Sequence, residues 1–325
     1  MKVVYMGTPE FAVPPLLEII KHHQVVAVLT QPDRPAGRGH KLTPSPVKVA
    51  ALAHGIEVLQ PETLRIRKGD NEAANAAAKE ARSILQGYGA DIFVVAAYGL
   101  ILPKAVLEMP RRGSINIHAS LLPKYRGASP IHAALLNGDT ETGITIIHMD
   151  TGIDTGDMIL KRSLVIPQEE HFPSLHNRMA ALGAATIIEA LTALDNGSAE
   201  RTPQNHDIHS YAPMIKKTDG QINWQTTSQE IINKTRALDP WPGAYTSLNG
   251  QPLKIWQAEK TSWSQNATNS ISPGAVLTAN PTDGLTIKTA DGAIKITEIQ
   301  PPDKKRMPTT DYLRGQKLEL GLILG

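Results

Sequence analysis

The sequence predicts an α/β protein, with a doubly wound, mostly parallel sheet followed by a small all-β barrel domain. Two observations predict this order. Over the first 160 residues, short β-branched runs alternate with helical patterns, which is typical of a parallel sheet covered by helices on both faces. Beyond residue 213 the helical patterns give way to short strands separated by Gly, Asn and Pro turns. A chain of 325 residues also exceeds one average domain.

The expected strands of the first region are apolar on both faces, as strands between two helical layers should be. They are KVVYM (2–6), VVAVLT (25–30), IEVL (56–59), IFVVAAY (92–98), SINIH (114–118) and ITIIHMD (144–150). Those of the second region are AYTSL (244–248), LKIWQA (253–258), GAVLTA (274–279), GLTIKTA (284–290) and AIKITEI (293–299). Ligands of doubly wound sheets bind beyond the carboxyl ends of the strands, so the loops after the first set are expected to carry the site.

Helix start and stop signals lie between these strands. SPVKVAALAHG combines a Ser N-cap, a Pro at the first helical position and a Gly past the end, and SPIHAALLNG (129–138) repeats the device. Further helices are expected over 71–87 and 174–197. The polar segment 201–213 has no periodicity and is expected to be a linker, which divides the chain into domains 1–200 and 214–325.

Composition and missing motifs exclude several classes of protein. Without cysteine there are no disulfides, thiolate nucleophiles or Cys-based zinc sites, and a net charge of +2 is too small to indicate nucleic acid by itself. The fingerprints G-x-G-x-x-G, P-loop and G-x-S-x-G are absent, which argues against a dinucleotide cofactor. No apolar run approaches the ~18 residues of a membrane span or a secretory signal, so a soluble, cytoplasmic protein is expected.

Asn116 and His118 are the first candidates for catalysis. They lie two residues apart on one expected strand, so their side chains leave the same face. An amide donor beside an imidazole can polarise a carbonyl and stabilise an oxyanion. A histidine at a strand end can equally be a structural residue, so the pair needs a partner before it indicates a reaction.

The run MDTGIDTGD (149–157) supplies that partner. It follows the next expected strand, so Asp154 is expected at the same sheet edge as the Asn-x-His pair, where a carboxylate can orient the ring. Asp150 and Asp157 are better explained as caps of an Asp-Gly turn. Metal binding by the three Asp residues is not supported by any His or Glu at ligand spacing, so no metal is expected.

The segment 31–48 is much longer than an ordinary connection between a strand and a helix. It carries several cations, among them Arg34, Arg38 and Lys41, between Gly and Pro residues. A basic loop can bind phosphates, and a solvated mobile loop is the alternative.

These motifs together resemble the formyltetrahydrofolate-dependent formyltransferases. INIHASLLPKYRGASPI followed by DTGIDTGD carries the resemblance, and MGTPEFAVP, TQPDRPAGRGHKLTPSPVK, AAYGLILP and ALDPWPGAYT extend it over nearly the whole chain. The resemblance implies a Rossmann-like formyltransferase domain and an OB-like, tRNA-binding barrel. It also implies transfer of a formyl group from 10-formyltetrahydrofolate to the α-amino group of methionine on initiator methionyl-tRNA, for translation initiation, by a monomeric enzyme.

The resemblance also assigns residues. It implies that Asn116, His118 and Asp154 are catalytic and that the basic loop contacts tRNA through Arg34, Arg38 and Lys41. The residues implied for the folate pocket are Tyr98, Gly99, Leu100, Leu102, Ser120, Leu121, Leu122 and Pro123.

Three alternatives share some of these features. A formyltransferase acting on a small amine, such as glycinamide ribonucleotide or an amino-sugar nucleotide, would use the same three catalytic residues but would need neither the basic loop nor the β domain. A folate-dependent formyl hydrolase is the second alternative. A non-enzymatic RNA-binding protein is the third, and it would be expected to have lost at least one of the three catalytic positions.

Overall fold

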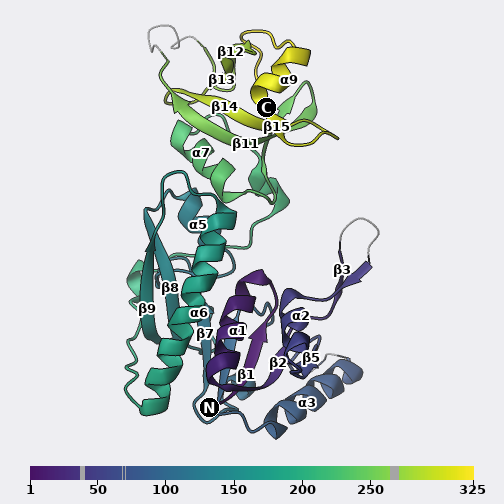
Figure 1. Cartoon of the computed structure of the whole chain (residues 1–325), viewed down its shortest axis with the longest axis vertical. Coiled ribbons are helices and arrows are strands. Elements are labelled where there is room, and N and C mark those ends of the chain that lie inside the picture. Colours follow the sequence, from purple (N-terminus) through teal and green to yellow (C-terminus); the bar gives the residue numbers. More distant parts are fainter. Residues whose placement is uncertain (37–40, 68, 70, 264–270) are drawn as a thin grey trace. The chain divides into compact units, whose positions relative to one another are not determined.

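The computed structural model describes residues 1–36, 41–67, 69, 71–263 and 271–325 (Figure 1). These residues form two compact units. The first unit comprises 1–130, 141–165 and 176–212, and the second comprises 131–140, 166–175 and 213–325. None of the helices in the described ranges has the length and apolarity that crossing a lipid bilayer requires.

A seven-stranded mixed sheet forms the centre of the first unit, in the order β5-β2-β1-β6-β7-β8-β9. Its parallel strands are β1 (Lys2–Gly7), β2 (Gln24–Leu29), β5 (Val58–Leu59), β6 (Ile92–Ala96) and β7 (Ser114–His118). The last two strands are β8 (Glu141–His148), which runs antiparallel to β7, and β9 (Met158–Val165), which runs antiparallel to β8. The prediction of a mostly parallel α/β sheet is confirmed.

Both faces of this sheet are buried, as the apolar strand runs predict. Val4 and Met6 of β1 pack into one core cluster with Phe93, while the alternate residues Val3 and Tyr5 are also fully buried. The Tyr5 hydroxyl donates a hydrogen bond to the carbonyl oxygen of Ala12 at 2.6 Å, which satisfies its polar atom inside the core.

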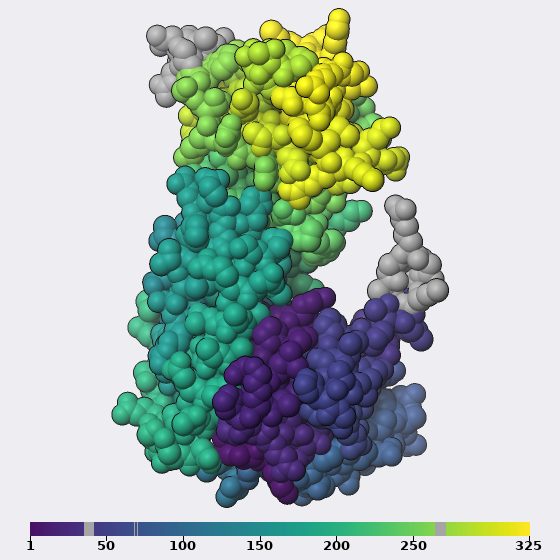
Figure 2. Space-filling model, in the orientation of Figure 1, coloured from purple at the N-terminus to yellow at the C-terminus, as the bar shows by residue number. Residues whose placement is uncertain are grey.

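The helices of the first unit include those expected after Ser45 and Ser129. They are η1 (Glu10–Ala12), α1 (Val13–His22), α2 (Pro46–Ala53), α3 (Glu72–Gly87), α4 (Lys104–Leu107), α5 (Pro130–Leu136), α6 (Phe172–Asn196) and η2 (His206–Ile208), with α5 and α6 extending into the second unit. At the start of α2, the Ser45 hydroxyl accepts a hydrogen bond from the Lys48 amide at 3.1 Å. The outer side of α6 lies on the surface (Figure 2).

Three strands of the first unit were not predicted, nor was the two-residue β15 (Met307–Pro308) of the second. Strand β9 carries exposed Lys161 and Arg162 along its middle, so no apolar run marks it. Inside the long basic segment, β3 (Arg34–Ala36) and β4 (Lys41–Thr43) pair as a short antiparallel ladder. Ladders this short leave no period for the sequence to display.

The second unit is an antiparallel β domain, as predicted. Its strands are β10 (Ala244–Leu248), β11 (Gln251–Thr261), β12 (Val276–Asn280), β13 (Gly284–Lys288), β14 (Ala293–Gln300) and β15 (Met307–Pro308), and its helices are η3 (Lys217–Gly220), α7 (Ser228–Ala237) and α9 (Thr309–Gly315). The five main strands follow the order β10-β11-β14-β13-β12.

Residues 322–325 are hydrogen-bonded to both edge strands of this sheet, β12 and β10. The Val276 amide at the start of β12 donates to the carbonyl oxygen of Leu322 at 2.8 Å, and the Gly325 amide donates to that of Ser247 in β10 at 3.0 Å. The terminal segment thereby bonds to both edge strands, which satisfies edge groups that would otherwise be open to pairing.

A buried carboxylate ties several elements of the second unit together. Asp239, after α7, lies 3.4 Å from His171 Nδ1 and accepts a hydrogen bond from Arg306 Nη1 at 3.2 Å. Burial alone would raise the pKa of Asp239, but the hydrogen bond from His171 and the charge of Arg306 outweigh it and lower the pKa.

We therefore expect Asp239→Asn to lower the free energy of unfolding by about 2 kcal/mol at pH 7. A lowered folded pKa means that the contribution is fully present above the unfolded pKa of about 3.9 and is lost as the pH falls through the folded value. Urea unfolding at pH 7 and near pH 3 measures the difference. The exposed control Asp303→Asn should match the parent at both pH values, and an Asp239→Asn effect of equal size at both would contradict the assignment.

Candidate functional site

Strand β7 places Asn116 and His118 side by side. They leave the same face of the strand and are only 9% and 4% exposed. The neighbouring strands hold the backbone of Asn116 in register, with Val95 of β6 on one side and Ile147 of β8 on the other. Both side chains are therefore held by the sheet and not by a loop.

Asp154 meets this pair from the turn between β8 and β9. Its Oδ1 accepts a hydrogen bond from Asn116 Nδ2 at 3.2 Å, and its Oδ2 lies 3.5 Å from His118 Nδ1. The backbone amide of Gly127 also donates to Oδ2, at 2.8 Å. The three residues that the sequence singled out thus lie together around one carboxylate.

Asp154 was expected beside His118 because the strand before it was expected to end at the same sheet edge, and this reason was wrong. Strand β8 is antiparallel to β7, so its carboxyl end lies beside Ser114, at the opposite end of β7 from His118. The two strand ends do not share an edge. Instead the turn 149–157 folds back over the face of β7, with Asp154 in the left-handed region at φ +52°. Asp tolerates this conformation better than most residues do.

The other nitrogen of His118 is also hydrogen-bonded. Nε2 lies 2.9 Å from the carbonyl oxygen of Tyr125, and because a carbonyl can only accept, Nε2 is the donor. Nδ1 faces the Asp154 carboxylate. With an acceptor beside each nitrogen, the orientation of the His118 ring is fixed from both sides.

Asp150 caps its own turn, as expected. Its Oδ1 accepts from the Gly152 amide at 3.0 Å and from the Thr155 hydroxyl at 2.7 Å. Across the described part of the chain, no group of three or more His, Cys, Asp or Glu side chains is arranged to hold a metal ion.

The segment after β6 divides between the core and the surface. Tyr98 is 2% exposed and packs with Leu102 in the core, and burial raises the pKa of the Tyr98 phenol. Gly99 is exposed at φ +81°, where an added Cβ would lie 2.1 Å from Gln31 Nε2, and Leu100 is half-buried. Gly99 and Leu100 are thus the more accessible of the four candidates for folate contacts.

The segment after β7 is held by hydroxyl groups. The Thr145 hydroxyl donates to the Ser120 carbonyl at 2.7 Å and accepts from the Leu122 amide at 3.1 Å. Ser120 and Leu122 are buried, whereas Leu121 and Pro123 are half-buried. The side chains of Leu121 and Pro123 are accordingly better placed to meet a ligand.

The basic segment is described only in part. Arg34 is exposed on β3, Lys41 begins β4, and Arg38 lies outside the described residues. Lys48 belongs to α2, where its Nζ donates to Asp33 at 2.7 Å and lowers the pKa of that carboxyl together with Gln60.

Two further residues at the site were not predicted. Arg126 and Gln204 are 2% and 5% exposed, and they are hydrogen-bonded to each other beside the Asp154 turn. Arg126 lies in the segment that follows β7, and the sequence offered no reason to single it out. Gln204 lies in the aperiodic segment 201–213, where no pattern marks a buried side chain.

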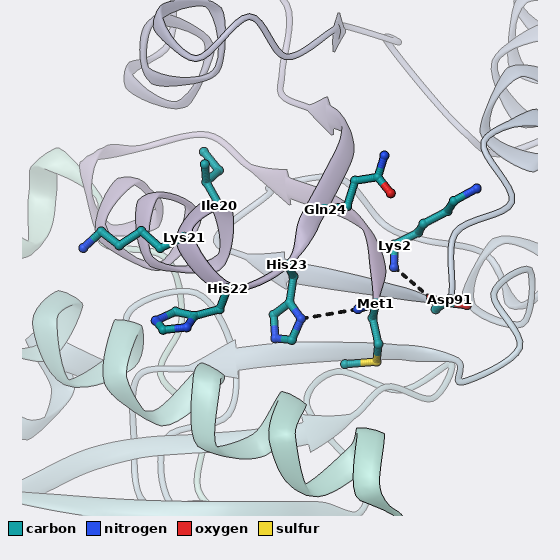
Figure 3. Close-up of a pocket in the computed structure, with 8 residues that line it drawn as sticks. All are labelled: Met1, Lys2, Ile20, Lys21, His22, His23, Gln24 and Asp91. Atoms are coloured by element: carbon teal, nitrogen blue, oxygen red, sulfur yellow. Dashed lines mark hydrogen bonds between the residues drawn. The ribbon is translucent and has the colours of Figure 1, made fainter.

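A separate pocket of about 610 Å³ lies at the amino ends of β1 and β2 (Figure 3). Its lining residues are Met1, Lys2, Ile20, Lys21, His22, His23, Gln24 and Asp91. Burial and the nearby amino terminus lower the pKa of His23. This is the opposite edge of the parallel strands from the one that binds ligands in such sheets, so we do not assign the reaction to it.

Comparison with known proteins agrees with this arrangement. Residues 1–191 match the family described as formyl transferase, and residues 214–317 match the formyl transferase C-terminal domain. The methionyl-tRNA formyltransferase of Geobacter metallireducens is 46% identical, with 100% of this chain and 99% of that protein covered. That of Chromobacterium violaceum is 44% identical, with both chains covered completely.

Solved structures share the fold at lower identity. WlaRD, a sugar 3N-formyl transferase, has a TM-score of 0.64 at 21% identity, with 94% of this chain and 99% of WlaRD covered. HypX from Aquifex aeolicus, solved with tetrahydrofolic acid, has a TM-score of 0.61 at 17% identity, covering 96% of this chain and 47% of HypX.

The chain belongs to the formyl transferase family and, within it, to the methionyl-tRNA formyltransferases. It is therefore an enzyme of formyl transfer, as the sequence motifs implied.

Gly127 offers a direct test of how tightly the Asp154 turn is held. Its φ is +106°, and an added Cβ would lie 2.9 Å from the Ala212 carbonyl oxygen. We expect Gly127→Ala to cost about 1–3 kcal/mol of stability and to lower turnover, because the amide that donates to Asp154 must shift. Thermal unfolding and a formylation assay measure both. Gly87→Ala, at a helical position with open space around it, is the matched control and should retain parental stability and turnover.

Proposed function

We propose that this enzyme transfers the formyl group of 10-formyltetrahydrofolate to the α-amino group of methionine on initiator methionyl-tRNA. We also propose that it acts as a monomer in the cytoplasm. The grouping of Asn116 and His118 on β7 with the Asp154 carboxylate supports the formyl transfer step. The 46% identity over the full chain to the methionyl-tRNA formyltransferase of Geobacter metallireducens supports methionyl-tRNA as the acceptor.

The side chains present suit a reacting carbonyl. As the neutral amine attacks the formyl carbon, negative charge develops on the formyl oxygen, and hydrogen-bond donors in a water-poor site stabilise it. Asn116 Nδ2 is such a donor. In the absence of substrate it is directed to Asp154 Oδ1 over a 3.2 Å hydrogen bond, which a stronger acceptor can replace. His118 supplies a second donor when the substrate oxygen takes the place of the Tyr125 carbonyl at Nε2.

Asp154 has the complementary role. Its Oδ2 faces His118 Nδ1 at 3.5 Å, so the carboxylate orients the ring. The attacking amine must lose a proton as the C–N bond forms. Asp154 can accept it directly or through water, and the folate nitrogen that leaves must gain one.

The remaining candidate residues follow from the same placement. The accessible positions near the ends of β6 and β7, Gly99, Leu100, Leu121 and Pro123, are proposed to contact the folate. The buried Tyr98, Leu102, Ser120 and Leu122 are proposed to shape that pocket from behind. Arg34, Arg38 and Lys41 are proposed to contact tRNA phosphates, for which cationic side chains are suited.

We expect Asn116→Ala and His118→Ala each to fold normally and to lower turnover by at least about 10²–10³-fold, the usual cost of losing one oxyanion donor. Turnover of methionyl-tRNA by the purified variants measures this, with circular dichroism as the check on folding. His22→Ala, at an exposed helix end, is the matched control. Parental turnover in either site variant would remove these residues from the mechanism.

The substrate is tested with four acceptors in parallel. We expect formyl transfer to methionyl initiator tRNA, and little or none to methionyl elongator tRNA, glycinamide ribonucleotide or an amino-sugar nucleotide. Transfer to a small amine alone would keep the three catalytic residues and overturn every assignment to tRNA.

A further inference from the structure

The segment 202–212 is bonded to both loops of the site. Thr202 exchanges two backbone hydrogen bonds with Met158, directly after the Asp154 turn, at 2.8 and 2.9 Å. Further along, the Arg126 amide donates to the Ser210 carbonyl at 2.8 Å, and the Ala212 amide donates to the Arg126 carbonyl at 2.7 Å. The segment lies between the regions matched by the two family models, yet it packs directly behind the catalytic residues.

Gln204 is the one buried side chain of this segment that reaches the Asp154 turn. Its Nε2 donates to the carbonyl oxygen of Asp154 at 2.7 Å and to that of Gly156 at 2.8 Å. Both amide hydrogens therefore hold the backbone on either side of Thr155. Because Asp154 is in the left-handed region, these bonds fix the direction in which its carboxylate leaves the turn.

Arg126 fixes the Gln204 amide from the side opposite the turn. Its Nε and Nη2 donate to Gln204 Oε1 at 3.1 and 2.8 Å. A guanidinium can only donate, so it selects the amide oxygen, and the two carbonyls can only accept, so they select the amide nitrogen. Both ends of the amide thus favour the one orientation that holds the turn.

Arg126 is a buried cation at the site. Its side chain is 2% exposed, and its guanidinium is hydrogen-bonded to the neutral Gln204 amide and lies 3.3 Å from His206 Nδ1. Moving a cation out of water is costly, and an apolar pair of similar length would avoid that cost.

We propose that Arg126 and Gln204 are positioning residues, which hold Asp154 in the orientation that His118 and the attacking amine require. The proposal rests on the proposed function, because it assigns a role to the same site. Neither side chain needs to touch the substrate. Arg126 acts through Gln204, and Gln204 acts through the backbone of the turn.

Two variants separate positioning from plain structural support. Gln204→Glu keeps an oxygen for Arg126 and gives it a charged partner, but replaces the two N–H donors with an oxygen. Arg126→Met combined with Gln204→Met replaces the polar pair with apolar side chains of similar length. Thr202→Val, whose side chain is exposed on the same segment, is the matched control.

We expect both variants to fold, with melting temperatures within about 5 °C of the parent, and to lose about 10–100-fold in kcat. KM for methionyl-tRNA and for the folate should stay within about threefold, and the pH profile of kcat should change, because the Asp154–His118 contact loosens. Thr202→Val should match the parent in melting temperature, kcat, both KM values and the pH profile.

Other outcomes overturn the inference. A kcat within about threefold of the parent in either folded variant would show that the turn keeps its place without the pair. Failure of both variants to fold, or a loss of kcat that only matches the unfolded fraction, would make the pair a structural element. The parental enzyme assayed in parallel separates the two claims, since an inactive parent would reject the proposed function and an active parent with active variants would reject only this inference.

Discussion

The Asp154 carboxylate is the point on which the site depends. It accepts hydrogen bonds from Asn116 in the sheet and from the backbone of Gly127, and it lies beside His118. A carboxylate with several fixed partners is held far more firmly than a surface side chain, because each contact removes a direction in which it could turn. This group links the two proposed oxyanion donors, which the sheet positions, to the general base of the proposed reaction.

Topology explains why so many contacts are needed. Since β7 and β8 are antiparallel, the chain leaves β8 at the end of β7 that is remote from His118, and the Asp154 turn must fold back across the face of β7. A turn that crosses a strand face receives no ladder hydrogen bonds from that strand. Gly127 on one side and Gln204 on the other supply the missing restraint.

Much of this could be predicted from the sequence, for definite physical reasons. The α/β unit could be predicted because buried parallel strands are apolar runs and helix ends such as Ser45 carry capping signals. The antiparallel domain could be predicted because its short strands are separated by Gly, Asn and Pro turns. Asn116, His118 and Asp154 were found because their residue types suit acyl transfer. The direction of β8 was predicted wrongly, because a run of apolar residues has no polarity that distinguishes parallel from antiparallel pairing. Arg126 and Gln204 were missed because only their hydrogen bond to each other marks them, and it joins residues 78 positions apart in the sequence.

The reversed strand also sets a rule for engineering this scaffold. One inserted residue in the turn between β8 and β9 would advance the chain by about 3.3 Å, enough to carry the carboxylate past its partners on β7. The length of that connection is therefore as fixed as a catalytic side chain. The ladder of β3 and β4 is free of such a requirement, since its pairing involves none of Asn116, His118 and Asp154. A designer who wishes to change the acceptor should vary the segment around β3 and β4 and keep the other connection at its present length.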